Sequence, residues 1–373
     1  MSSKKDIRFM KIPYTIGSYL AVTPDYNFEK KVIKRPRVHQ IYAFLLACAI
    51  SVLSGITVVD NATLSMKQQV PTVFILDLIN FFFLFLHPIV MITNSSLLSV
   101  SFWAKINKNF QFIDEHFNNV HKKEPNFFKN CYVQFALCLG GYLLDNLVVT
   151  ISSLNLFPEL ALTKIHILSQ IFYTYEFFTC FLICNLTTAF KCRFDEISRE
   201  LQNHMKPSTT FIRQNGHFWR ILSESAVCFN QIFGWPLIFL IGRGVAQLLQ
   251  SLHLTMLALN SDLTLKKGIY GDLVVANLFI VAYLTVCLVF VILTCDSAAS
   301  SGNEISNLCY KLQKDFADSS SERRELILLA KEISDNPIKF TASDFFEINK
   351  STFFGIISVT TTYLIILIQF KNS

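Results

Sequence analysis

A run without a single charged side chain extends from Ser351 to Phe370, close to the end of the chain. As a helix it would be about 30 Å long, which is enough to cross the hydrocarbon core of a bilayer. Polar and small residues interrupt its apolar surface at a helical period and form one stripe, which consists of Gly355, Ser358, Thr362 and Gln369, with the apolar Ile366 on nearly the same line. In a membrane helix such a stripe faces either another helix of the bundle or the water of a pore.

The remaining composition indicates an all-α polytopic membrane protein. Of the 373 residues, 52% are hydrophobic and only 16% are charged, so the chain carries more apolar surface than one soluble core could hide. No repeat or flexible linker divides it, and we expect residues 1–373 to form one domain with seven membrane-spanning helices. The predicted spans are Gln40–Val59, Val70–Trp103 (with Pro88 inside it), Cys131–Leu154, Lys164–Phe190, Ala226–Leu249, Leu273–Thr294 and Ser351–Phe370.

The distribution of Lys and Arg predicts the orientation of these spans. Of the 33 basic residues, 27 lie in the N-terminal segment and in the loops after the second, fourth and sixth spans. This excess places the N-terminus in the cytoplasm and, with seven spans, the C-terminus outside the cell; one missed span would reverse the position of the C-terminus. The loops account for the net charge of +6, which therefore does not indicate nucleic acid as a partner. Asn61 opens an Asn-Ala-Thr triplet in the first outer loop and is a candidate for N-glycosylation.

The largest polar segment, residues 296–350, is predicted to form two cytoplasmic helices that extend the six-helix bundle of residues 40–295 below the membrane. The sequence of Ser319–Glu322 is typical of a helix start, and Asn336-Pro337 would end that helix. Its apolar residues fall on one face, which consists of Leu326, Leu329, Ala330 and Ile333.

Polar and aromatic side chains in the outer half of the bundle are candidates for a ligand pocket. The candidates are Asp145, Gln170, Tyr173, Glu176, Trp235, Arg243, Gln247 and Tyr283, and Asn146 and Asn277 are further polar residues of the same spans. Two alternatives stay open. Asp145, Glu176 and Arg243 either pair inside the bundle as structural groups or contact a ligand that enters from outside. His87, beside Pro88, is better explained as a hydrogen-bonded histidine at a helix kink than as a ligand contact.

The last span ends with Thr362-Tyr363, five apolar residues and Gln369-Phe370. This pattern resembles the signature of insect gustatory receptors, and Phe340–Phe346 resembles the segment that leads into the last helix of those proteins. The resemblance implies a ligand-gated, nonselective cation channel in the plasma membrane of chemosensory neurons, assembled as a homo- or heterotetramer around one pore. It would place Gln369 and Phe370 at the narrow outer end of the pore, with Thr362 and Ile366 deeper, and would make residues 296–350 an intracellular anchor between subunits.

The ligand implied by the resemblance is a small-molecule tastant. Leu364 stands where typical sugar receptors of the family have Glu, so we expect a bitter or deterrent compound, with a fructose-type receptor as the alternative. A metabotropic receptor and a membrane transporter are the competing classes. The sequence shows no pair of repeat halves with broken helices, as many transporters have. It also shows no nucleophile–base pair, phosphate-binding loop or metal-ligand constellation, so no enzyme, cofactor or metal site is predicted.

Overall fold

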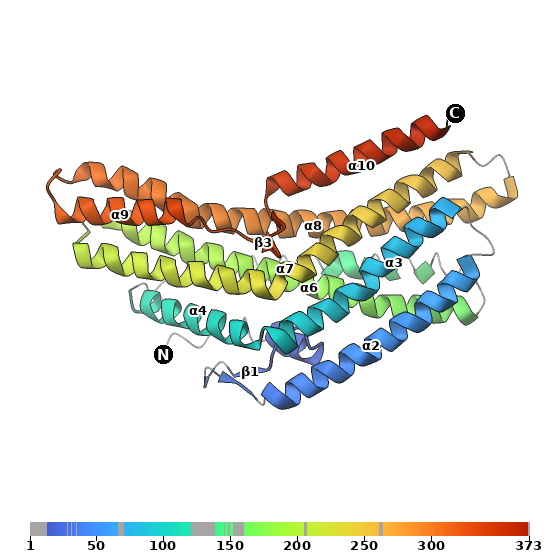
Figure 1. The fold of residues 1–373 in the computed structure, drawn as a ribbon, viewed down its shortest axis with the longest axis horizontal. Coiled ribbons are helices and arrows are strands. Elements are labelled where there is room, and N and C mark those ends of the chain that lie inside the picture. Colours follow the sequence, from blue (N-terminus) through green and yellow to red (C-terminus); the bar gives the residue numbers. More distant parts are fainter. Residues whose placement is uncertain are drawn as a thin grey trace.

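Long helices that run roughly along one axis make up the molecule (Figure 1). The computed structural model describes residues 13–27, 29–30, 32–34, 36–65, 71–120, 139–144, 146–147, 150–151, 160–204, 207–260 and 264–371. The helices are α2 (Pro36–Ser65), α3 (Pro71–Ile92), α4 (Val100–Val120), α6 (Leu160–Asn203), α7 (Thr209–Asn260), α8 (Thr264–Leu312), α9 (Ser321–Asp335) and α10 (Lys350–Lys371). The all-α prediction is confirmed.

Two antiparallel hairpins of two-residue strands accompany the helices. The first pairs β1 (Tyr26–Asn27) with β2 (Val32–Ile33), and the second pairs β3 (Thr341–Ala342) with β4 (Phe346–Glu347). The second hairpin links α9 to α10, so it leads directly into the charge-free helix.

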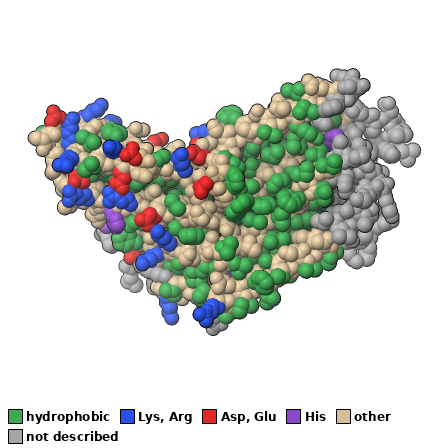
Figure 2. All heavy atoms as spheres, in the orientation of Figure 1, with side chains coloured by type: hydrophobic (Ala, Val, Ile, Leu, Met, Phe, Trp, Pro, Cys, Tyr) green, Lys and Arg blue, Asp and Glu red, His purple; other side chains and the backbone are tan. Residues whose placement is uncertain are grey.

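The two ends of the molecule differ in surface chemistry. Charged side chains gather at the end where α9 lies, whereas hydrophobic side chains cover much of the other half (Figure 2). Among the described residues, four helices are long and apolar enough to cross a membrane, and residues Lys350–Ile366 form a shorter apolar helix; the four are Pro36–Thr57, Ile75–Leu98, Thr209–Met256 and Asn277–Asp315. The fourth predicted span lies within α6. Of the third, only residues 139–144, 146–147 and 150–151 are described, and these are helical.

Three helices continue far beyond the predicted ends of their spans. α6, α7 and α8 have 44, 52 and 49 residues, which is about twice the length that a bilayer requires. α8 passes without a break through the expected boundary between residues 295 and 296. The first of the two helices expected in 296–350 is therefore the end of α8, and α9 packs against it and against α7.

The structure confirms the details predicted for α9. The Oγ of Ser320 caps its start by accepting a hydrogen bond from the backbone N–H of Arg323 at 3.2 Å, and Asn336 caps its end. The four apolar residues of its predicted face are all buried. Ion pairs connect its outer side to α7, namely Arg213–Glu325 at 2.6 Å and Arg220–Glu332 at 2.5 Å.

The second apolar run, predicted as one long span over Val70–Trp103, is divided between two helices. A π-helix, η1 (Thr93–Leu98), separates α3 from α4, and its wider turn is seen in the 3.0 Å hydrogen bond from the N–H of Ser99 to the carbonyl of Asn94. The N-terminal segment packs on this turn, because the hydroxyl groups of Ser95 and Ser96 donate hydrogen bonds to carbonyls of residues 22 and 21. These contacts use the polar groups that interrupt the run.

Candidate functional site

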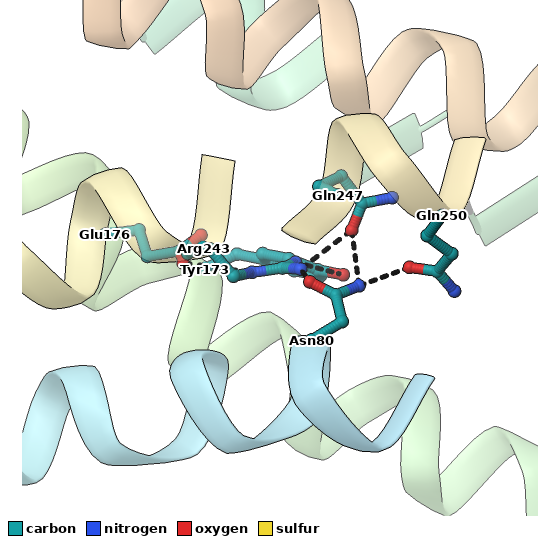
Figure 3. A network of polar contacts seen from close by, with 6 residues as sticks. All are labelled: Asn80, Tyr173, Glu176, Arg243, Gln247 and Gln250. Atoms are coloured by element: carbon teal, nitrogen blue, oxygen red, sulfur yellow. Dashed lines mark hydrogen bonds and ion pairs between the residues drawn. The ribbon is translucent and has the colours of Figure 1, made fainter. Parts of the chain in front are cut away.

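A buried polar network connects α3, α6 and α7, with Arg243 at its centre (Figure 3). The guanidinium of Arg243 donates hydrogen bonds to Oε1 of Glu176 at 3.2 Å and to Oε1 of Gln247 at 2.7 Å. It also donates to Oδ1 of Asn80, and its Nη2 lies 3.5 Å from the hydroxyl of Tyr173. The side chain is only 1% exposed, so these partners replace the water that the charge has lost.

The charge of Arg243 is balanced by Glu176, whose side chain is also 1% exposed. Oε2 of Glu176 has no hydrogen-bond partner within the described part of the chain. The predicted structural pairing of these two residues is therefore present. The pairing does not exclude a ligand contact, because Oε2 of Glu176 can still accept a hydrogen bond.

Three members of the network were not predicted, namely Asp77, Asn80 and Gln250. The side-chain amide of Asn80 donates to Oε1 of Gln247 at 2.6 Å and to Oε1 of Gln250, which in turn donates to Asp77. Their spacing in the sequence could have indicated that they belong to a polar face, because Asp77 and Asn80 lie one turn apart on α3, and Gln250 lies two turns beyond Arg243. Gln247 extends the network to α8 by donating to Oδ1 of Asn277 at 2.9 Å.

Aromatic side chains from three helical segments lie beside this network on the same part of α6. The ring of Tyr142 stacks on Phe177 with centroids 5.2 Å apart, and Tyr283 of α8 lies 6.4 Å from Tyr142. The hydroxyls of Tyr142 and Thr174 are 2.7 Å apart. Tyr283 thus joins the candidate region, and Tyr142 was missed because one tyrosine in an apolar run carries no periodic signal.

The other predicted pocket residues are not brought together in this way. Trp235 is 49% exposed and lies against Phe345, with ring centroids 6.1 Å apart, in the segment that leads into α10. Gln170 is half-buried on α6, one turn from Thr174. Asp145 lies outside the described residues. His87 is buried, and neither ring nitrogen has a hydrogen-bond partner among the described residues, so they give no support to the predicted hydrogen bond of this histidine.

The predicted pore stripe of α10 is not covered by the rest of the chain. Gly355, Thr362, Ile366 and Gln369 are all exposed, and a Cβ at Gly355 would meet no atom within 4 Å. Tyr363 is half-buried, and the side chain of Phe370 lies outside the described residues. The opposite face of α10 packs Phe353 and Ile356 on the core and borders a cavity of about 200 Å³; α7 and α8 line its other side with Leu248, Thr285, Leu288 and Val289.

One further predicted site can be placed. Asn61 lies within α2, which extends to Ser65, rather than in a loop after the first span. Among the described residues, no group of three or more His, Cys, Asp or Glu side chains could hold a metal ion.

A family model described as 7tm Chemosensory receptor matches residues 10–373. The chain belongs to this family. This receptor is similar to Gustatory receptor 68a of Drosophila melanogaster, with 29% identity over 183 residues. The match covers 45% of this chain and 46% of the relative, so it spans less than half of the relative's length. As a family member with several membrane-spanning helices, the receptor is a multi-pass protein of the plasma membrane.

The fold of the receptor is that of a solved insect olfactory receptor, OR5 from Machilis hrabei. The structure of that protein in complex with eugenol gives a TM-score of 0.64 over 97% of this chain and 99% of the other. A second structure of OR5 gives 0.63 over 97% and 98%. The sequence identity of 13% limits the likeness to the fold.

Proposed function

We propose that this receptor is a subunit of a ligand-gated, nonselective cation channel that responds to small-molecule tastants. The observation that supports this most directly is the uncovered stripe of α10. Polar side chains turned toward lipid are costly, whereas four copies of the helix around one axis would turn the same side chains toward water. The absence of charged side chains between residues 351 and 370 accords with weak selectivity among cations. In this arrangement the N-terminus is cytoplasmic and the C-terminus lies outside.

The buried network and its aromatic neighbours are the proposed ligand region. They combine apolar walls with a few directed polar groups, which is typical of sites for small organic molecules. Leu364, in place of the Glu of typical sugar receptors, favours a bitter or deterrent compound. The alternative, a fructose-type receptor, would be recognised by a response to fructose.

The first test needs no ligand. An epitope is placed after Ser373 and a second one at the N-terminus, and intact cells are stained without permeabilisation. We expect only the C-terminal epitope to be stained. A C-terminal epitope that stays hidden on surface-delivered protein would contradict the span count and the pore together, and would favour a metabotropic receptor or a transporter.

The second test measures whole-cell current during application of a panel of bitter compounds, sucrose and fructose. Thr362 and Thr360 form a matched pair, because each hydroxyl donates to the carbonyl four residues earlier, at 2.9 and 2.8 Å. Thr362 lies on the stripe, whereas Thr360 is half-buried and borders the cavity beside α7 and α8. We expect Gln369→Ala and Thr362→Val to change gating or ion preference, and Thr360→Val to change them less. Unchanged currents in the first two variants, at equal surface level, would exclude the stripe from the pore.

A further inference from the structure

Three irregular features lie at the same position along the long axis of the receptor. α7, which contains Pro236, bends in its middle, η1 separates α3 from α4, and the β3–β4 hairpin turns the chain from α9 into α10 (Figure 1). Each is a place where regular backbone hydrogen bonding is interrupted. The contacts between them show that the three interruptions are connected.

The first connection satisfies the bond that Pro236 removes from α7. A proline has no N–H, so the carbonyl four residues earlier, that of Ile232, loses its partner within the helix. The side-chain amide of Asn94, from η1, donates to this carbonyl at 2.7 Å and to that of Gln231 at 2.9 Å. Asn94 is 9% exposed, so water does not readily replace it. η1 thus supplies the hydrogen-bond donor that α7 lacks at Pro236.

The second connection holds the hairpin against the same stretch of α7. The side chain of Asn230 donates to the carbonyl of Lys339 at 2.9 Å and accepts from the N–H of Thr341 at 3.0 Å. One turn further along α7, Gly234 lies directly against the hairpin. A Cβ at this position would come within 2.7 Å of the backbone nitrogen of Ser343. The close approach therefore requires glycine.

The hairpin itself is tightly constrained. Ser343 and Asp344 have φ angles of 47° and 60°, the left-handed region that side chains disfavour. The hydroxyl of Thr341 donates to Oδ1 of Asp344 at 2.9 Å, and the N–H of Ile348 donates to the carbonyl of Phe340 at 2.7 Å. A constrained turn passes a displacement of α7 on to α10 instead of absorbing it.

We propose that Asn94, Asn230, Gly234 and Pro236 form a joint through which α7 positions the start of α10. Seven residues beyond Pro236, about 10 Å along the helix, α7 carries Arg243 of the buried network. A change of the bend therefore moves the candidate ligand region and the hairpin together. Asn94, Asn230 and Gly234 act as positioning residues, and their role in gating rests on the proposed channel function.

Hydrogen–deuterium exchange of the purified full-length receptor tests the joint without any ligand. We expect Asn94→Ala to speed exchange at least about threefold near Pro236. We also expect faster exchange in residues 338–356, although among the described residues the side-chain amide of Asn94 donates to α7 and not to the hairpin. Gly234→Ala, which acts from the hairpin side, should speed exchange in both segments. Asn215→Ala is the matched control, because this buried amide of α7 donates, within the described part of the chain, only to the carbonyl of Phe211 in its own helix, at 3.1 Å.

The outcome that would overturn the joint is faster exchange near Pro236 with rates in residues 338–356 equal to those of the unchanged receptor. An equal effect of Asn215→Ala would also overturn it, since the effect would then reflect general loosening. If Asn94→Ala does not fold, Asn94→Gln, which keeps the amide and displaces it by one methylene, replaces it with the same expectation. Hydrogen–deuterium exchange tests the joint without measuring current, whereas the channel proposal is tested by current recording. A failure of one proposal can therefore be distinguished from a failure of the other.

Discussion

Glu176→Leu would leave the guanidinium of Arg243 buried without its counter-ion. Both side chains are 1% exposed, so neither reaches solvent within this chain. Removing one partner of a buried pair costs about 3–5 kcal/mol, because an uncompensated charge stays behind. Arg243 keeps hydrogen bonds to Asn80, Gln247 and Tyr173, so we expect the lower end of this range, about 3 kcal/mol. This corresponds to a change of about 100-fold in the unfolding equilibrium.

The double variant Glu176→Leu/Arg243→Met removes both charges together. The remaining cost is that the side-chain carbonyls of Asn80 and Gln247 lose a donor, which we estimate at about 1–2 kcal/mol. The double variant should therefore be more stable than Glu176→Leu alone.

The assay is thermal denaturation of a fluorescent fusion in detergent, followed by size-exclusion chromatography, together with surface labelling in cells. Glu332→Leu is the control, because it breaks an ion pair whose side chains are 31% and 52% exposed, and such pairs contribute about 0–1 kcal/mol. The reasoning is refuted if Glu176→Leu is no more destabilising than this control. It is also refuted if the double variant is no more stable than Glu176→Leu alone.

The remaining predictions concern the end of the molecule where α9 lies and the first span. Leu326→Ala, at a fully buried position of α9, should cost about 2–5 kcal/mol in the same thermal assay, whereas Leu328→Ala at a 51% exposed position should cost under about 0.5 kcal/mol. The hydrogen bond from Arg213 lowers the pKa of Glu325 in the folded protein, so the ionised Glu325 contributes to stability above the ordinary pKa of 4.5 and this contribution is lost as the pH falls through the lower folded pKa. Hydrogen–deuterium exchange in α9 should become faster over that pH range, and Arg213→Met should remove this pH dependence. Asn61→Gln should abolish a glycosidase-sensitive mass shift; a wild-type receptor with no such shift would refute glycosylation at this site.

Periodicity within one helix was sufficient to predict α9 and α10. α9 has a buried and an exposed face that can be read from a spacing of three to four residues, and its ends carry the local signals Ser320 and Asn336. α10 has half-buried and exposed residues, and its lack of charged side chains indicates the span. The stripe of α10 was read from the same spacing, which left open whether another helix covers it. These features depend on residues close together in the chain.

Contacts between helices could not be predicted in the same way. The period of α7 shows that Arg243 and Gln247 share a face, but not that Asn80 of α3 faces them, because the relative rotation of two helices depends on the packing of both. η1 was missed for a similar reason. Asn94 stabilises it through carbonyls about 137 residues further along the chain, a distance beyond any local pattern.

The unbroken course of α6, α7 and α8 restricts how parts of this receptor can be exchanged with those of a relative. A chimaera that combines the outer half of one protein with the inner half of another must be joined in the middle of three helices. One inserted or deleted residue at such a junction turns everything beyond it by about 100° about the helix axis. Substitutions keep the rotational phase, so recombination between relatives should succeed only where all three junctions preserve residue number.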